Sequence, residues 1–150
     1  MKSMYILLLP ALFFISCADN TDEQPAAATA VEEQHEHSHE QEGIELNNGQ
    51  KWKVDENMMV YLVQMEKDIT GFSGTTMAEY KQLASGLEQN IELLTSNCTM
   101  EGQAHDELHK WLLPFMELSE QFSASATEPD AEKYYGQIKT SMEDFHRYFE

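Results

Sequence analysis

The chain is short of basic residues, and this shortage excludes one class of partner. Its 150 residues include 9 Lys and Arg against 27 Asp and Glu, so the formal net charge is −18. Phosphate binding needs clustered Lys and Arg, so we expect no nucleic-acid partner. The same charge argues against docking on anionic lipid by electrostatic attraction alone.

The sequence also lacks the motifs that identify common classes of enzyme. There is no glycine-rich phosphate loop and no nucleophile elbow, and no carboxylate pair stands out from the generally acidic sequence. Cys98 and His105 could be read as a nucleophile and its base, but nothing orients the imidazole or supplies an oxyanion hole. We therefore expect a protein that is not an enzyme.

No apolar run is long enough to cross a membrane. The longest extends from Met4 to Ile15, whereas a spanning helix needs about 20 residues. It follows Lys2 and is succeeded by Ser16 and Cys17, an order that is typical of a secretory signal. Residues 1–16 are therefore predicted to be a signal peptide.

The residues at the end of this segment indicate a lipid anchor. Phe14-Ile15-Ser16-Cys17 resembles the lipobox of bacterial lipoproteins, with Phe14 in place of the more usual leucine. The resemblance implies cleavage before Cys17, a diacylglycerol on its sulfur and an acylated amino terminus. Several acyl chains hold a protein stably on a membrane, which would place this one in the bacterial cell envelope. The alternative is an ordinary secreted protein cut near Ala18.

Residues 17–46 read as a disordered, acidic tether. The stretch has no Lys or Arg and few large apolar residues, so it cannot bury enough surface to offset its ordering entropy. His35, His37 and His39 alternate with other residues inside it. Such short tracts can collect metal ions weakly and unselectively. The alternative is a solvated tether in which the histidines are incidental.

The remaining residues, 47–150, are predicted to form an all-α domain. Apolar residues recur at spacings of three and four, which indicates four helices: about 55–70, one that starts after Thr76, about 102–122, and one that follows Thr127. Short connections favour an up-down-up-down four-helix bundle. The alternative is a three-helix core from which the first helix is detached. Trp52 is expected to fold onto the domain.

The stretch SNCTMEGQAHDELHKWL gathers the strongest candidate ligands. If Cys17 carries lipid, Cys98 has no partner within the chain and is expected to be buried or ligated. Met100 follows in the predicted turn. His105 and His109 are four residues apart on one predicted helix, so both imidazoles share a face. The intervening residues do not match the metalloprotease motif, which has a glutamate directly after its first histidine.

Topology adds weaker candidates. In an up-down bundle this turn lies at the same end as the start of the first helix and the end of the fourth, which carry Met58, Met142 and His146. Thiolate, thioether and imidazole together favour copper(I), with zinc as the second choice. Each residue taken singly could instead be structural, because buried cysteine and methionine commonly fill hydrophobic cores.

Three hypotheses for function follow. The first is a metal-binding envelope lipoprotein that captures copper, or less favourably zinc. The second is a structural or interaction bundle that contacts an envelope partner without a metal, with Trp111, Tyr61 and Tyr135 as candidate exposed aromatics. The third is a b-type haem bundle with His146 and either Met58 or Met59 as axial ligands; no C-x-x-C-H motif is present, so the haem would not be attached covalently.

Overall fold

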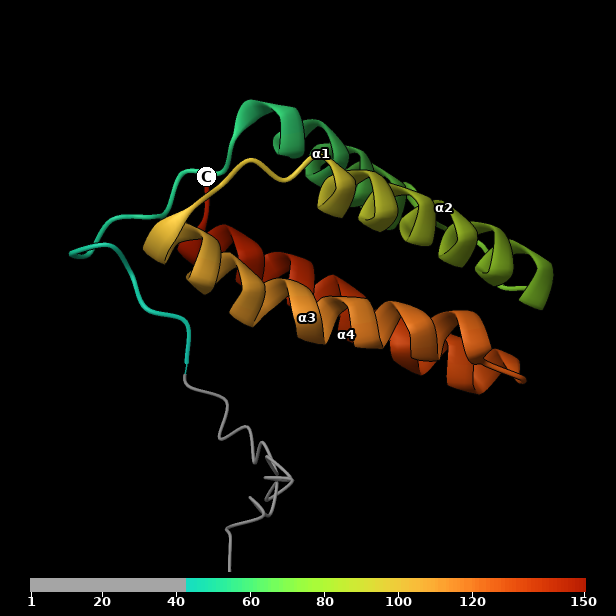
Figure 1. Ribbon diagram of the computed structural model, residues 1–150. Helices are drawn as coiled ribbons and strands as arrows, with labels where there is room; N and C mark the ends of the chain where they lie inside the picture. The colour runs from blue at the N-terminus through green and yellow to red at the C-terminus, as the bar shows by residue number, and fades with distance from the viewer. Residues whose placement is uncertain (1–42) are drawn as a thin grey trace, which may run out of the picture. The chain divides into compact units, whose positions relative to one another are not determined.

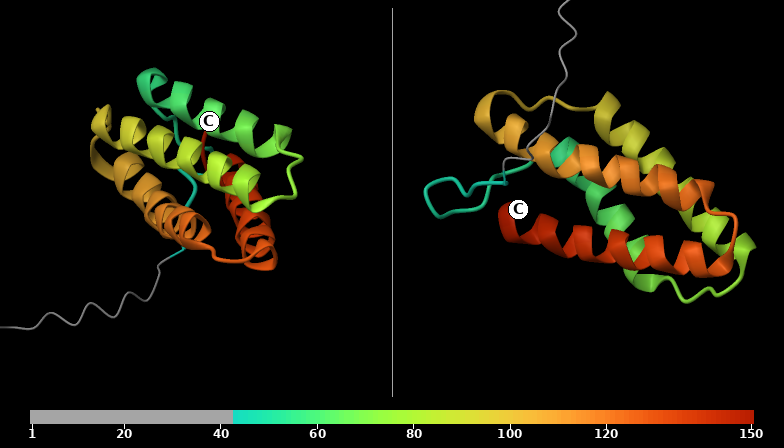
Figure 2. Two further views of the ribbon diagram at one scale, coloured as in Figure 1. Left: turned by 90° about the vertical axis from the view of Figure 1, so that its right-hand side faces the viewer. Right: turned by 90° about the horizontal axis from the view of Figure 1, so that it is seen from below.

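The computed structural model describes residues 43–150, which form four helices (Figure 1). These are α1 (Glu56–Gly71), α2 (Met77–Ser96), α3 (Gly102–Ala124) and α4 (Glu128–Tyr148). Two views at right angles show consecutive helices running side by side in opposite directions (Figure 2). The predicted all-α, up-down-up-down four-helix bundle is therefore confirmed. The predicted signal peptide and most of the tether lie outside the described residues.

Local signals in the sequence explain where the helices begin. Thr76 and Glu79 form a capping box at the start of α2, in which each side chain accepts a hydrogen bond from the other residue's backbone N–H. Thr127 accepts the N–H of Asp130 at the start of α4, with Pro129 in the first turn. α3 begins at Gly102, whose φ of 65° favours glycine, and it continues through Pro114.

The core is built from the apolar faces of all four helices. Met58, Leu62, Met65 and Ile69 of α1 are all buried, and α1 contacts both α2 and α4. The alternative in which the first helix is detached is therefore wrong. The largest fully buried side chains include Phe115, Phe122, Phe145 and Phe149. Each such side chain contributes about 1.5–3 kcal/mol through removal from water.

The core differs from the predicted one at several aromatic positions. Trp111 is buried at 3 % exposure, and its Nε1 donates to the carbonyl oxygen of Ser141 at 2.8 Å, so the prediction of an exposed Trp111 was wrong. Tyr134 and His105, which the apolar spacing of their helices predicts to face the core, are only half-buried. Tyr61 and Tyr135, which were predicted to be exposed, are half-buried, and the Tyr135 hydroxyl donates to the carbonyl oxygen of Ile69 at 2.8 Å.

The segment before α1 is attached to the bundle. The backbone of Trp52 pairs with Tyr148, the last residue of α4, and with Glu150 beyond it, which confirms that this tryptophan folds onto the domain. Its Nε1 donates to the carbonyl oxygen of Glu45 at 2.6 Å. The N–H of Glu45 in turn donates to the buried carboxylate of Glu107 on α3 at 2.8 Å. We call residues 43–54 the strap.

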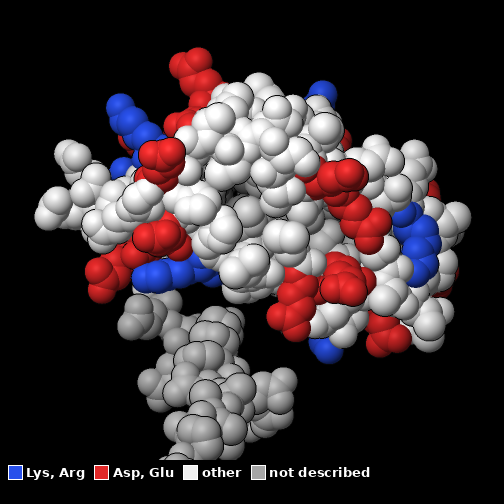
Figure 3. Space-filling view, in the orientation of Figure 1, with Lys and Arg blue, Asp and Glu red and all other residues white. Residues whose placement is uncertain are grey.

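The surface of the described domain is acidic. On the face drawn in Figure 3, Asp and Glu side chains appear at many points and Lys and Arg at fewer. None of the helices between residues 43 and 150 is both long enough and apolar enough to cross a membrane.

Candidate metal centre

The turn between α2 and α3 lies against the start of α1. Asn57 Nδ2 donates to the carbonyl oxygen of Asn97 at 2.6 Å, and Thr99 Oγ1 donates to Asp55 Oδ2 at 2.5 Å. The strap joins the same region to the end of α4 through Trp52. These bonds bring the α2–α3 turn, the start of α1 and the end of α4 to one end of the bundle, as the topology predicts (Figure 1).

Cys98 occupies the middle of this turn, just beyond the last residue of α2. It is a free cysteine and is half-buried, and it packs against the edge of the hydrophobic core. Its backbone N–H donates to the carbonyl oxygen of Thr95 at 3.4 Å. Because the thiol is neither fully enclosed nor fully exposed, a modest side-chain rotation can change its surroundings.

The methionine candidates belong to the core. Met58, Met100 and Met142 are exposed by only 0 %, 9 % and 4 % respectively, and all three are members of the same buried cluster. In this arrangement they pack as apolar side chains. Met100 is the one of the three that lies on the α2–α3 turn, two residues from Cys98.

His105 and His109 form a pair on the first turns of α3. Their ring centroids are 4.2 Å apart, with the ring planes tilted by 52°. Both are half-buried. Burial lowers the pKa of His109, and the neighbouring His105 lowers it further, while Asp106 acts in the opposite direction. The neutral imidazole, which is the form that binds metals, is therefore favoured at His109.

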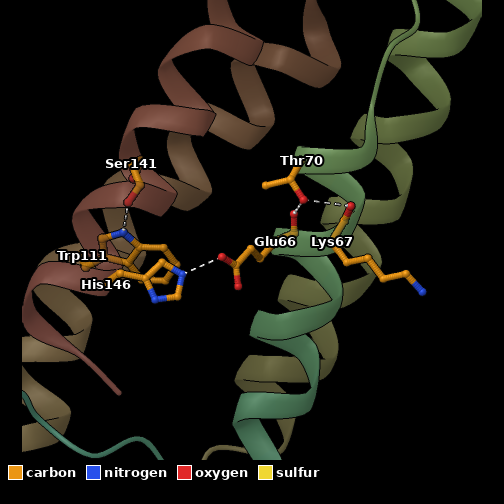
Figure 4. Close-up of polar contacts among 6 residues, drawn as sticks. All are labelled: Glu66, Lys67, Thr70, Trp111, Ser141 and His146. Carbon is orange, nitrogen blue, oxygen red and sulfur yellow. Dashed lines mark hydrogen bonds and ion pairs between the residues drawn. The ribbon is translucent and has the colours of Figure 1, made fainter.

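His146 is engaged elsewhere. Its Nε2 lies 2.9 Å from Oε1 of Glu66, so the ring bridges α4 and α1 (Figure 4). For the haem hypothesis, the methionines offered as its axial partner are the fully buried Met58 and the half-buried Met59. His146 would have to release Glu66 before that nitrogen could bind iron.

Two surface grooves on the described part of the chain lie away from the candidate ligands. The larger, of about 570 Å³, lies beside the α1–α2 turn at the other end of the bundle and is lined by residues such as Phe72 and Leu83. The second, of about 480 Å³, lies between α3 and α4 near Leu118 and Gly136. Neither groove is lined by His105 or His109.

The structure thus brings part of the predicted set together. His105 and His109 are adjacent, and Cys98 and Met100 lie on the turn that leads into their helix. Within residues 43–150, no group of three or more His, Cys, Asp or Glu side chains stands ready to hold a metal ion. The lipid-attachment candidate and the tether histidines, Cys17, His35, His37 and His39, lie outside the described residues.

Sequence reasoning did not identify the residues that hold the turn. The sequence predicts Asp55 only as a capping residue at the start of α1, and it does not single out Asn57 or Thr99. Polar residues are common beside helix ends, so their presence does not predict a contact between residues that are 44 positions apart in the sequence.

In comparisons with known proteins, the sequence matches no protein-family model, no curated protein and no solved structure.

Proposed function

We propose that this is a lipid-anchored protein of the bacterial cell envelope whose helical domain binds one copper(I) ion, or less favourably zinc, at the His105–His109 pair. The observation that carries the proposal is the 4.2 Å separation of the two rings on one helix face. Histidines four residues apart on a helix can reach the same ion. The pair is half-buried, which limits competition from water.

Cys98 and Met100 are the proposed additional ligands. Two imidazoles leave the coordination of a metal incomplete, and thiolate and thioether are the donors that copper(I) prefers. The turn that carries both sulfur atoms continues directly into α3. Bound sulfur and nitrogen sit within about 2.0–2.3 Å of a zinc ion, so binding must draw the thiol and the two rings toward a common point.

The electrostatics of His109 support the same function. Metal ions compete with protons for imidazole nitrogen, and a lowered pKa weakens the proton as a competitor. Metal binding to Cys98 would also protect a lone thiol in an oxidising compartment.

The anchor and the tether complete the proposal. The resemblance of residues 14–17 to a lipobox supports lipidation at Cys17, and the acidic domain makes lipid rather than charge the membrane contact. His35, His37 and His39 would act as a weak collector. The protein would capture or buffer metal, and it would not be a catalyst.

A metal titration tests the proposal. We would use a chain from Ala18 to Glu150, in which His35→Gln, His37→Gln and His39→Gln remove the tether ligands. We expect about one equivalent of copper(I) per chain, measured by competition with a chromophoric chelator. Cys98→Ala should abolish tight binding, and His109→Ala should weaken it at least tenfold, about 1.4 kcal/mol.

The matched control removes an imidazole that lies outside the pair. His146→Gln should leave the copper(I) affinity unchanged, because His146 contacts Glu66 on α1. Unchanged stoichiometry and affinity in both Cys98→Ala and His109→Ala would end the proposal. Similar losses in Cys98→Ala, His109→Ala and His146→Gln would show that all three side chains affect copper(I) binding through the stability of the fold.

The second candidate function is a metal-free interaction bundle. It is favoured by exposed apolar side chains, of which Val60 and Val63 lie three residues apart on α1 at 59 % and 53 % exposure, and Leu113 on α3 reaches 56 %. A ligand that binds only the native state raises its melting temperature. A melting temperature that does not change with excess copper(I) or zinc would favour this second function.

A further inference from the structure

The His105–His109 pair lies on a face of α3 that solvent reaches. Both residues are half-buried, and the side chain of His105 is 31 % exposed. Asp106, next to His105 in the sequence, is 75 % exposed, and its carboxylate Oδ1 lies 3.9 Å from Nδ1 of His105. A second molecule can therefore approach the two imidazoles, beside a negative charge that favours a cation.

The pair supplies only two of the ligands that zinc takes. Zinc in structural sites is almost always held by four ligands in a tetrahedron, and imidazole nitrogen is one of the ligands that suit it. Within residues 43–150, no His, Cys, Asp or Glu side chain joins the pair to make a group of three. The turn that carries Cys98 is held to α1 by the hydrogen bond from Thr99 Oγ1 to Asp55 Oδ2. A zinc ion at the pair therefore gains Cys98 only if that turn moves.

We propose that zinc joins two copies of this chain, with His105 and His109 of each copy as its four ligands, an inference that rests on the function proposed above and names a partner of the same site. A two-fold axis through the ion places the same pair on both sides of it, so one surface serves both copies. Copper(I) is expected to stay with one chain, because it prefers the sulfur donors of Cys98 and Met100.

The row of side chains that carries the pair continues with an apolar residue. Leu113 follows His109 by four residues, so it lies one turn further along the same row of α3, and it is 56 % exposed. Side chains four residues apart form the ridges through which two helices most commonly pack. When the α3 helices of two copies meet at the zinc ion, each Leu113 is brought against the other copy and removed from water.

The charge of the chain makes this association depend on the metal. Two copies that each carry a formal net charge of −18 repel each other, and a high net charge keeps proteins monomeric. The positive charge of zinc at the contact offsets part of that repulsion. The proposed lipid anchor would favour the same association, because chains confined to one membrane surface meet at a higher effective concentration.

Sedimentation equilibrium and zinc calorimetry test the proposal. The Ala18–Glu150 chain without tether histidines should be monomeric with a chelator and dimeric with zinc, at about one zinc ion per two chains. A Cys98→Ala form of that chain should dimerise equally, because neither a disulfide nor the thiol forms the link. His109→Gln should remove the zinc-dependent dimer, and glutamine is a good helix former. The matched control His146→Gln should leave the dimer intact, because His146 contacts Glu66.

A second pair of variants tests the contact surface and leaves every ligand in place. Leu113→Glu puts a charge on the row beside the pair and should weaken the zinc-dependent dimer about tenfold. Leu93→Glu changes an exposed leucine on α2, which is 46 % exposed, and should have no effect on the dimer. Circular dichroism should be unchanged in both, because neither side chain is in the core. Equal dimerisation of the two variants would overturn the contact along α3.

The remaining outcomes separate this inference from the proposed function. A chain that binds copper(I) but does not dimerise with zinc overturns the shared zinc site alone. A zinc-dependent dimer that survives His109→Gln, or one that is lost in Cys98→Ala, also overturns the shared site. A chain that binds neither metal overturns the inference together with the proposed function.

Discussion

The imidazole Nε2 of His146 lies 2.9 Å from the carboxylate Oε1 of Glu66, and this pair joins the first and last helices of the bundle. A second link nearby runs from the hydroxyl of Tyr135 to the carbonyl oxygen of Ile69. The side chains of the ion pair are 46 % and 39 % exposed, so solvent screens their attraction. The packing of α1 against α4 therefore depends on the buried apolar faces of the two helices.

A double-mutant cycle measures how much this ion pair contributes. Glu66→Gln, His146→Gln and the double variant should show a coupling free energy of at most about 1 kcal/mol at pH 6, from urea unfolding. A coupling free energy above about 2 kcal/mol would show that the packing of α1 against α4 requires the ion pair.

Glu107 is a buried anchor for the strap. Burial alone would raise the pKa of its carboxyl, but hydrogen bonds from Lys110 and from the N–H of Glu45 outweigh that effect and hold the pKa below its ordinary value. Glu107→Ala leaves the Glu45 N–H without its acceptor and should destabilise the fold by about 1–3 kcal/mol. Because Trp52 contacts Glu45, the tryptophan fluorescence should also change.

The pH dependence of this effect has a defined sign. A carboxyl whose pKa is lower in the folded chain stabilises the fold above its unfolded pKa, and this contribution is lost as the pH falls through the folded pKa. The difference in unfolding free energy between the parent chain and Glu107→Gln should therefore be constant near pH 7 and shrink below about pH 4.5. A difference that grows on acidification would contradict the assigned direction.

Two glycines should respond to alanine in opposite ways. A Cβ on Gly74 would lie 2.6 Å from the Cβ of Glu79 and 2.7 Å from the ring of Phe72, so Gly74→Ala should destabilise the chain by about 1–3 kcal/mol. A Cβ on Gly86, inside α2, meets nothing within 4 Å. Gly86→Ala should stabilise the chain by about 0.5–1 kcal/mol, because glycine is a poor helix former. Thermal unfolding of both variants checks the pair, and changes of the same sign would contradict it.

The helices could be predicted because their signals are local. Apolar spacing predicted the four helices with boundaries close to the observed ones, and the Thr76–Glu79 capping box and Pro129 are local signals that agree with two of the starts. The exposure of Trp111 was predicted wrongly because a pattern within α3 does not show which helix packs against it. Its burial depends on α4, where the carbonyl oxygen of Ser141 accepts its N–H, and a pattern within α3 carries no information about that neighbour.

The candidate site likewise has one feature that local sequence predicts and one that depends on how the helices pack. The His105–His109 pair follows from a spacing of four on one helix, and the two rings lie together in the structure. The contact between Asp55 and Thr99 does not follow from the residues around Asp55, which predict a helix cap. Its partner Thr99 is brought to it by the packing of α2 on α1, a relationship that only the folded chain reveals.

The lowered pKa of His109 makes a final prediction about metal binding in acid. Protons displace a metal from histidine once the pH falls toward the pKa of the free imidazole. Because burial and His105 lower the pKa of His109, that loss should begin at a more acid pH than for an ordinary histidine. A Cys98→Ala form of the Ala18–Glu150 chain without tether histidines removes the thiol, whose own proton would otherwise compete with zinc in this pH range. The weak zinc affinity of that chain, measured by calorimetry, should fall less than about tenfold between pH 7.5 and pH 6.5. Asp106→Asn removes the one charge that opposes the shift, so it should move the onset further toward acid, whereas Glu143→Gln on α4 should leave it in place. An onset above pH 7 in the Cys98→Ala chain would show that His109 is not a ligand with a depressed pKa.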